Sequence, residues 1–239
     1  MWGLANPDRF MRFTRGWAAI LGVAAVLLLT AGLWLGFAAP EDYQQGDTVR
    51  IMFIHVPAAW VSMAAYVALG GTSFAALVWR HPLADAAAKT CAPIGAVFTA
   101  LALMTGSLWG KPMWGTWWVW DARLTSVVVL FLFYLGVMAL RAAIDDEGRA
   151  GRAAAILALV GLVNLPIIKF SVEWWSTLHQ PASVFRADGP TMTADYLWPL
   201  GLMGLGYTVL FVALWILAIR TEVRERRIAA LMLRQARES

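Results

Sequence analysis

Six long runs of hydrophobic residues, separated by short polar segments, dominate the chain. Each run approaches the roughly 20 apolar residues that a helix needs to cross a bilayer. The runs lie at about Trp17–Ala39, Met52–Trp79, Cys91–Trp109, Leu124–Leu140, Ala153–Phe170 and Leu197–Ile219. We therefore predict an all-α, polytopic membrane protein with six transmembrane helices, folded as one membrane domain over residues 1–239.

The composition agrees with this pattern, because 60% of the residues are hydrophobic and 14% are charged, against about 25% charged residues in a soluble domain. The polar segments differ in charge. Only five of the 19 Lys and Arg residues fall in the segments opposite the termini, namely Arg50, Lys111, Arg123, Lys169 and Arg186. The positive-inside rule then predicts that both termini are cytoplasmic. The net charge of +4 reflects this bias and does not indicate nucleic-acid binding.

The two ends of the chain carry separate signals. The first apolar run has 23 residues, more than the roughly 7–15 of a cleaved signal peptide, so we expect it to be retained as a membrane span. The cytoplasmic basic tail, at about residues 220–239, alternates arginines with apolar residues as in a short basic helix. It is expected either to lie on anionic lipid headgroups or to dock a cytoplasmic partner.

Polar and unusual side chains gather in the outer connections. No strongly ionisable side chain lies in the middle of a run, which argues against a proton relay or an ion-coupled carrier. The outer loop at about residues 111–123 lies within KPMWGTWWVWDARLTS and places Trp114, Trp117, Trp118 and Trp120 in seven positions. Interfacial aromatic belts explain scattered tryptophans but not this density. The loop therefore indicates a flat aromatic binding surface.

Two of the three histidines fall on the same outer side as this loop. His55 opens the second run in IMFIHVPAAW, where Pro57 suits the first turn of a helix, so we expect His55 at the helix entry. His179 lies in the third outer connection, in EWWSTLHQPA. His81 lies in a cytoplasmic connection and is expected to be solvated. An isolated outer histidine is most often a surface or capping residue, and it is the tryptophan loop that favours a binding role for this pair.

Two imidazoles facing each other across an aromatic platform suit haem iron, which they would hold on both axial sides. Tryptophan faces pack well against a flat apolar ring, and Arg50 and Arg123 are candidate partners for the haem propionates. The single cysteine, Cys91, has no C-x-x-C-H context, so any haem is expected to be held non-covalently. No Cys/His pair has the spacing of a zinc site.

Asp121 follows the tryptophans and precedes the fourth run. Three interpretations stay open: it caps the fourth helix, it pairs with Arg123, or it contacts a partner directly. No nucleophile, oxyanion arrangement or pair of catalytic carboxylates is evident in the sequence. We therefore predict a binding protein rather than an enzyme.

The stretch WGTWWVWDARLT resembles the WWD domain of the haem-handling superfamily, to which the CcmC family and the cytochrome c synthetases belong. Six spans, a single WWD loop between the third and fourth, and one outer histidine on each flank resemble the CcmC family specifically. The flanking stretches HVPAAW and STLHQP agree with the histidine positions of that family. The resemblance covers nearly the whole chain.

This resemblance implies a haem-delivery function in cytochrome c biogenesis. Members of the family hold haem b at the outer face of the bacterial inner membrane and present it to the periplasmic haem chaperone CcmE. They work with the ABC transporter subunits CcmA and CcmB and the small membrane protein CcmD. By this resemblance His55 and His179 are the axial ligands. The platform where haem and chaperone meet comprises Trp114, Gly115, Trp117, Trp118, Trp120 and Asp121.

Three other functions remain open from the residues. A b-type cytochrome subunit for quinol electron transfer would also use two histidines, although within its spans. A transporter carrying haem across the bilayer would need binding groups at the midplane or on both faces. A structural membrane subunit without a ligand would purify as a colourless protein.

Overall fold

A computed structural model describes residues 6–180 and 183–238, which form helices joined by short connections. The helices are α1 (Pro7–Phe13), α2 (Trp17–Ala38), the 3-10 helix η2 (Asp47–Ile51), α3 (Met52–Trp79), α4 (Pro82–Trp114), α5 (Ala122–Ala143), α6 (Glu147–Gly161), α7 (Asn164–Trp174) and α8 (Ala194–Glu238). The only β pairing in the described residues is an isolated bridge between Asp42 and Gly46. Six helical segments are long and apolar enough to cross a membrane, which confirms the predicted fold class.

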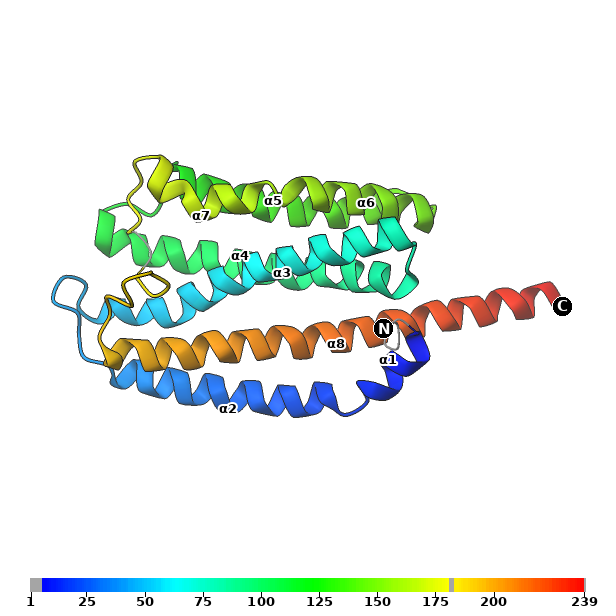
Figure 1. The fold of residues 1–239 in the computed structure, drawn as a ribbon, viewed down its shortest axis with the longest axis horizontal. Coiled ribbons are helices and arrows are strands. Elements are labelled where there is room, and N and C mark those ends of the chain that lie inside the picture. Colours follow the sequence, from blue (N-terminus) through cyan, green and yellow to red (C-terminus); the bar gives the residue numbers. More distant parts are fainter. Residues whose placement is uncertain (1–5, 181–182, 239) are drawn as a thin grey trace.

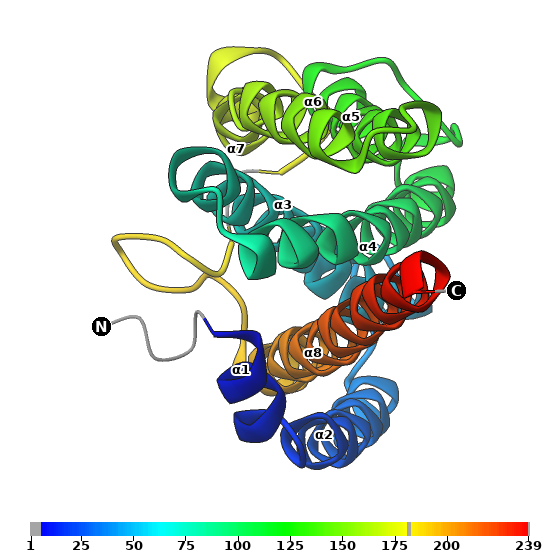
Figure 2. The same cartoon turned by 90° about the vertical axis from the view of Figure 1, so that its right-hand side faces the viewer.

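The helices stack in three layers, which are clearest when the bundle is viewed from its end (Figure 2). Helices α5, α6 and α7 form one outer layer, α3 and α4 form the middle layer, and α8 with α2 forms the other. The most extensive packing joins α3 to α4 and α2 to α8. Helix α1 and the C-terminal end of α8 lie at one end of the bundle, and the connecting residues 39–46, 115–121, 175–180 and 183–193 gather at the other (Figure 1).

Polar side chains define where several helices begin. Asp121 accepts a hydrogen bond from the Leu124 N–H at 2.7 Å, so it is the N-cap of α5, which confirms one of the three interpretations of this residue. Asp146 caps α6 in the same way. His81, expected to be merely solvated, is the N-cap of α4, because its Nδ1 accepts a hydrogen bond from the Ala84 N–H at 3.2 Å.

The third and fifth helical segments differ from the hydrophobic windows. Helix α4 starts at Pro82, nine residues before the predicted window, since the polar residues of its first turns lower the hydropathy without disfavouring a helix. It also continues to Trp114, so the connection before α5 spans residues 115–121 only. The fifth span is divided into α6 and α7 ahead of Pro166, because a proline removes a backbone donor and its ring clashes with the preceding turn.

The buried core lies where α3, α4 and α5 meet. Tyr66 and Tyr134 are fully buried there, with ring centroids 4.9 Å apart in an edge-on arrangement. The Tyr134 hydroxyl donates a hydrogen bond to the Ser62 carbonyl at 2.8 Å, which satisfies a polar group inside the apolar bundle. This core holds the middle layer rigidly beneath the connections at the loop-bearing end.

The other end of the bundle is held by charged side chains. Asp85 on α4 accepts hydrogen bonds from Arg141 on α5 and Arg226 on α8, each at 2.7 Å. Glu222, which is 4% exposed, accepts from Lys89 at 2.9 Å and from Arg226 at 2.6 Å. This five-residue ionic cluster joins three helices at the base of the α8 extension.

The basic tail is helical, as its pattern indicated, but it is a direct continuation of α8 and not a separate helix. The C-terminal end of α8 projects beyond the rest of the bundle, along the direction of the last span (Figure 1). Arg220 and Arg227 bind α1, through the Met11 carbonyl and the Asp8 carboxylate respectively. Both interpretations of the tail, a helix on anionic lipid headgroups and a docking element for a cytoplasmic partner, remain predictions.

Candidate functional site

His55 lies against α4 at the loop-bearing end of the bundle. Its Nδ1 is 3.0 Å from the Ala102 carbonyl and 3.1 Å from the Thr105 hydroxyl oxygen. The Thr105 hydroxyl donates its own hydrogen to the Leu101 carbonyl at 2.7 Å, so both oxygens near Nδ1 act as acceptors. The proton of the neutral ring is therefore assigned to Nδ1, which leaves the lone pair of Nε2 available to a metal.

The position of His55 differs from the sequence expectation. Helix α3 starts at Met52, directly after the 3-10 helix η2, and Pro57 lies inside α3 and not in its first turn. His55 is therefore within the helix, partly buried against its neighbour, and not at an open helix entry. The helix starts earlier because η2 delivers the chain in a helical conformation, with the Met52 N–H bonded to the Arg50 and Val49 carbonyls.

Trp109 completes the surroundings of His55. The two ring centroids are 5.7 Å apart, at an interplanar angle of 68°. The Trp109 indole N–H donates a hydrogen bond to the Gln45 side-chain oxygen at 2.9 Å, which joins the first outer connection to α4. The imidazole is thus held between the α4 backbone and an indole whose own position is fixed.

Asp121 holds His179 in place from the opposite side. While its Oδ1 caps α5, its Oδ2 lies 3.3 Å from both the Leu178 N–H nitrogen and the His179 Nδ1. Because a carboxylate only accepts hydrogen bonds, Nδ1 of His179 is the donor and Nε2 is again free. Carboxylate–histidine pairs of this kind orient metal ligands and raise their basicity.

The two histidines come together at this end of the bundle. Both lie against the C-terminal part of α4, His55 beside Trp109 and His179 beside Trp114. Trp114, in the last turn of α4, packs edge-on against His179 with ring centroids 4.9 Å apart. Both rings therefore present an unprotonated Nε2 from positions fixed by neighbouring groups, and neutral imidazole nitrogen is a donor that haem iron accepts.

The protonation of His179 is set mainly by burial. Burial lowers the pKa of His179 from its ordinary value of 6.5, the Asp121 carboxylate opposes this shift, and the Arg123 guanidinium adds to it. Below pH 6.5 an unfolded chain takes up a proton that the folded chain resists, so the contribution of His179 to stability falls as the pH falls through this window. At neutral pH the ring is uncharged and able to bind a metal.

We therefore expect ligation by His179 to survive mild acidification. If the pH of the haem-loaded protein is lowered from about 8 to about 4.5, the six-coordinate low-spin spectrum should persist below pH 6.5, because burial and coordination to iron both oppose protonation of the ring. The measurement is the Soret band of the purified protein at each pH. A midpoint at or above 6.5 would contradict a buried, neutral His179 ligand.

The tryptophans of the loop divide into inward and outward groups. Trp114 faces His179, and Trp118 is half-buried, with a buried indole N–H that has no hydrogen-bond partner among the described residues. Trp117 and Trp120 are 55% and 73% exposed. Gly115 ends α4 in the left-handed region at φ 74°, which a glycine adopts without strain and which starts the loop.

The two arginines proposed for the propionates have partners within the protein. Arg50 pairs with Asp47 in the 3-10 helix η2, and no interaction links it to either histidine in the part of the chain that the structure describes. Arg123 donates to the Ser171 hydroxyl at 3.2 Å and to the Ile168 and Lys169 carbonyls. Arg123 thus binds α5 to α7 and lies near Asp121 and His179, whereas Arg50 belongs to the rim of the site.

Sequence reasoning missed one face of α4. Ala102, Thr105, Gly106 and Trp109 are spaced as neighbours on one side of a helix, and all four adjoin His55. The spacing of three to four residues between Ala102, Thr105, Gly106 and Trp109 is a signal that could have indicated this face. The pairing of His55 with a backbone carbonyl on another helix has no sequence signal.

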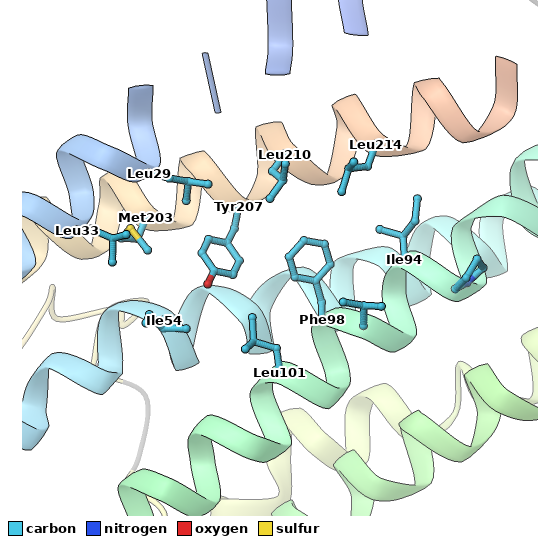
Figure 3. Close-up of a pocket in the computed structure, with 12 residues that line it drawn as sticks. Leu29, Leu33, Ile54, Ile94, Phe98, Leu101, Met203, Tyr207, Leu210 and Leu214 are labelled. Atoms are coloured by element: carbon cyan, nitrogen blue, oxygen red, sulfur yellow. The ribbon is translucent and has the colours of Figure 1, made fainter. Parts of the chain in front are cut away.

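A cavity of about 520 Å³ lies between α2, α3, α4 and α8 (Figure 3). Its walls are almost entirely apolar, and Phe98 and Tyr207 point into it from α4 and α8. Ile54 lines this cavity while the next residue, His55, faces α4. The cavity offers no nitrogen ligand for iron, so the candidate site remains the histidine pair.

The chain is similar to known proteins over almost its full length. A family model described as Heme exporter protein C (CcmC) matches residues 1–234. A Heme exporter protein C from Bradyrhizobium diazoefficiens is 59% identical over 233 residues, covering 98% of this chain and 89% of that protein. The protein of the same name from Escherichia coli K12 is 47% identical over 238 residues, covering 98% and 97%.

A plant relative shows the same breadth of similarity. The Marchantia polymorpha protein, described as a ccmC-like mitochondrial protein of cytochrome c biosynthesis, is 43% identical over 218 residues, or 91% of this chain and 92% of that protein. The residues matched by the family model include both outer histidines and the tryptophan loop.

Proposed function

The chain belongs to the CcmC family of haem exporter proteins, and on this premise we propose that it binds haem b at its loop-bearing end and passes it to another protein. The observation that carries the proposal is the pair of histidines, each with Nδ1 bound to a protein oxygen and Nε2 free. This is the tautomer in which an imidazole can bind a metal through Nε2.

The proposed site holds haem without a covalent bond to the protein. His55 and His179 bind the iron, and Trp109 and Trp114 fix the two imidazoles from the side. Cys91 is buried in the bundle, where its thiol contacts the Ala65 carbonyl, so it is not available for a thioether bond to haem. The unpartnered, buried indole N–H of Trp118 supplies a donor suited to an anionic ligand group at this end of the molecule.

The outer surface of the loop suits the acceptor protein. Trp117 and Trp120 are exposed beside the histidine pair, and Lys111 lies over the Trp117 ring at 5.8 Å. Exposed tryptophans are frequent anchors of protein interfaces. We assign this surface to the haem chaperone CcmE, with the transporter subunits CcmA and CcmB and the small protein CcmD as further partners in the membrane.

The orientation follows from the distribution of charge. The loop-bearing end carries few basic residues and is assigned to the periplasmic side of the bacterial inner membrane, and the ionic cluster and basic tail to the cytoplasm. The site has a binding constellation only, so the proposed role is delivery and not catalysis.

An absorption spectrum of the detergent-purified protein tests the proposal. We expect a Soret band and a pyridine haemochrome of non-covalent b-type haem, and loss of that haem to added apo-CcmE in a time-dependent transfer. A protein that stays colourless after haem is added would contradict haem binding. A haem that is reduced rapidly by quinol, and that CcmE does not remove, would favour an electron-transfer subunit instead.

A further inference from the structure

Two glycines one helical turn apart on α4 lie directly beneath the aromatic rings of the site. A Cβ placed on Gly106 would be 2.9 Å from Cε1 and 3.4 Å from Nδ1 of His55. A Cβ placed on Gly110 would be 2.9 Å and 3.1 Å from Cε3 and Cζ3 of the Trp114 indole. Both rings therefore rest on bare helix backbone.

The space above Gly106 decides where the His55 ring can lie. The ring reaches the Ala102 carbonyl at 3.0 Å only by lying close to the α4 backbone. Trp109 flanks the same ring and is fixed by Gln45. A methyl group at position 106 would push the imidazole away from its carbonyl partner, and the ring would lose the contact that directs Nε2.

The absence of a side chain at Gly110 affects His179 indirectly, because it determines where Trp114 can lie. The indole folds back over its own helix, and its edge contacts the His179 ring, with centroids 4.9 Å apart. A methyl group at position 110 would lift the indole toward His179. Gly106 thus adjoins His55 directly, and Gly110 adjoins Trp114, which in turn contacts His179.

We propose that Gly106 and Gly110 are positioning residues for haem ligation, because their missing side chains seat His55 and Trp114 and thereby fix the direction of both Nε2 atoms. This inference rests on the proposed haem-binding function. It differs from ordinary helix packing, as at Gly95, where an added Cβ would meet the ring of Tyr134 in the buried core. At Gly106 and Gly110 the added group meets the rings of the site itself.

The test compares Gly106→Ala with the matched control Gly71→Ala. Gly71 lies in α3, and a Cβ there would meet no atom within 4 Å. Alanine favours a helix at both positions, so we expect both variants to insert and to be purified in similar yield. Gly106→Ala should lower haem affinity by about tenfold or more, as removal of a group that orients a metal ligand does, and should shift the ferric spectrum from low-spin toward high-spin.

A double-variant comparison separates positioning from general damage. If Gly106 acts through His55, then adding Gly106→Ala to His55→Ala should change the haem affinity no further. The same result is expected for Gly110→Ala added to His179→Ala. Equal losses in the presence and absence of the histidine would overturn the proposal, as would a wild-type electron paramagnetic resonance spectrum in both glycine variants.

The failure of this inference can be told apart from failure of the proposed function. If His55→Ala changes the haem spectrum and Gly106→Ala does not, only the role of the glycines is wrong. If His55→Ala and His179→Ala both keep the wild-type spectrum, the axial assignment is wrong, and the glycine proposal falls with it.

Discussion

Replacement of His55 or His179 with alanine is expected to reduce haem affinity by at least about a hundredfold and to abolish the low-spin spectrum. Loss of a group that merely orients a metal ligand typically costs about 10–100-fold in affinity, and loss of the ligand itself should cost no less than the upper value. The remaining histidine would leave a weakly held, five-coordinate iron. Haem titration of the apo-protein, followed at the Soret band, measures both effects.

The third histidine provides a control of the same residue type. His81 caps α4 at the opposite end of the bundle, so His81→Ser removes the imidazole and keeps a side chain that caps helices well. We expect His81→Ser to bind haem as the wild-type protein does. If His55→Ala and His179→Ala bind haem no more weakly than His81→Ser, the site is not where the geometry places it.

Replacement of Asp121 with alanine is expected to weaken haem binding by about 10–100-fold, although Asp121 is not itself a ligand. This carboxylate caps α5, accepts the Leu178 N–H and orients the His179 ring. Its loss therefore releases the segment that carries His179. Asp121→Asn can still cap the helix through its amide oxygen, but its NH2 group would face His179 Nδ1 as a donor and favour the tautomer with the proton on Nε2, so haem binding should be weakened although the cap is kept.

Stability has to be separated from ligand orientation in this experiment. Loss of an N-cap costs about 1 kcal/mol, so Asp121→Ala should also lower the thermal stability of the protein in detergent. Asp146→Ala removes the equivalent cap of α6 at the other end of the bundle. Equal haem loss in the two variants would mean that Asp121 acts on the fold alone.

Much of the fold could be predicted because the bilayer imposes it. Long apolar runs must become helices in lipid, where no water satisfies the backbone, and the six runs correspond to six membrane-spanning segments. The family resemblance, based on the tryptophan motif and its flanking histidines, was confirmed over residues 1–234. The orientation of the termini and the roles of the ligand residues remain predictions.

Helix ends were less predictable, for reasons that differ from case to case. The hydropathy of the fifth run does not register the break before Pro166, which depends on one missing donor. The last window ended at Ile219 because charge begins there, yet α8 continues to Glu238, since arginine and glutamate are good helix formers. Hydropathy identifies the apolar part of a helix and not the residues at which the helix begins and ends.

The sequence identified candidate site residues but not their arrangement. Sequence spacing identified the two outer histidines, the tryptophan loop and the capping position of Asp121. It could not show that the Ala102 carbonyl receives the His55 Nδ1, or that Asp121 receives the His179 Nδ1, because these contacts join segments 47 and 58 positions apart. The tautomers that make the pair suitable for iron are a property of the fold.

The ionic cluster at the base of α8 has a mechanical consequence. Because Arg226 is bound to both Asp85 and Glu222, the exposed part of α8 is rigidly coupled to the last span. At 1.5 Å per residue, residues 228–238 form an arm of about 16 Å, so a tilt of the span by about 10° would move its tip by about 3 Å. A small change in the angle of the last span is therefore converted into a larger displacement at the end of this helix.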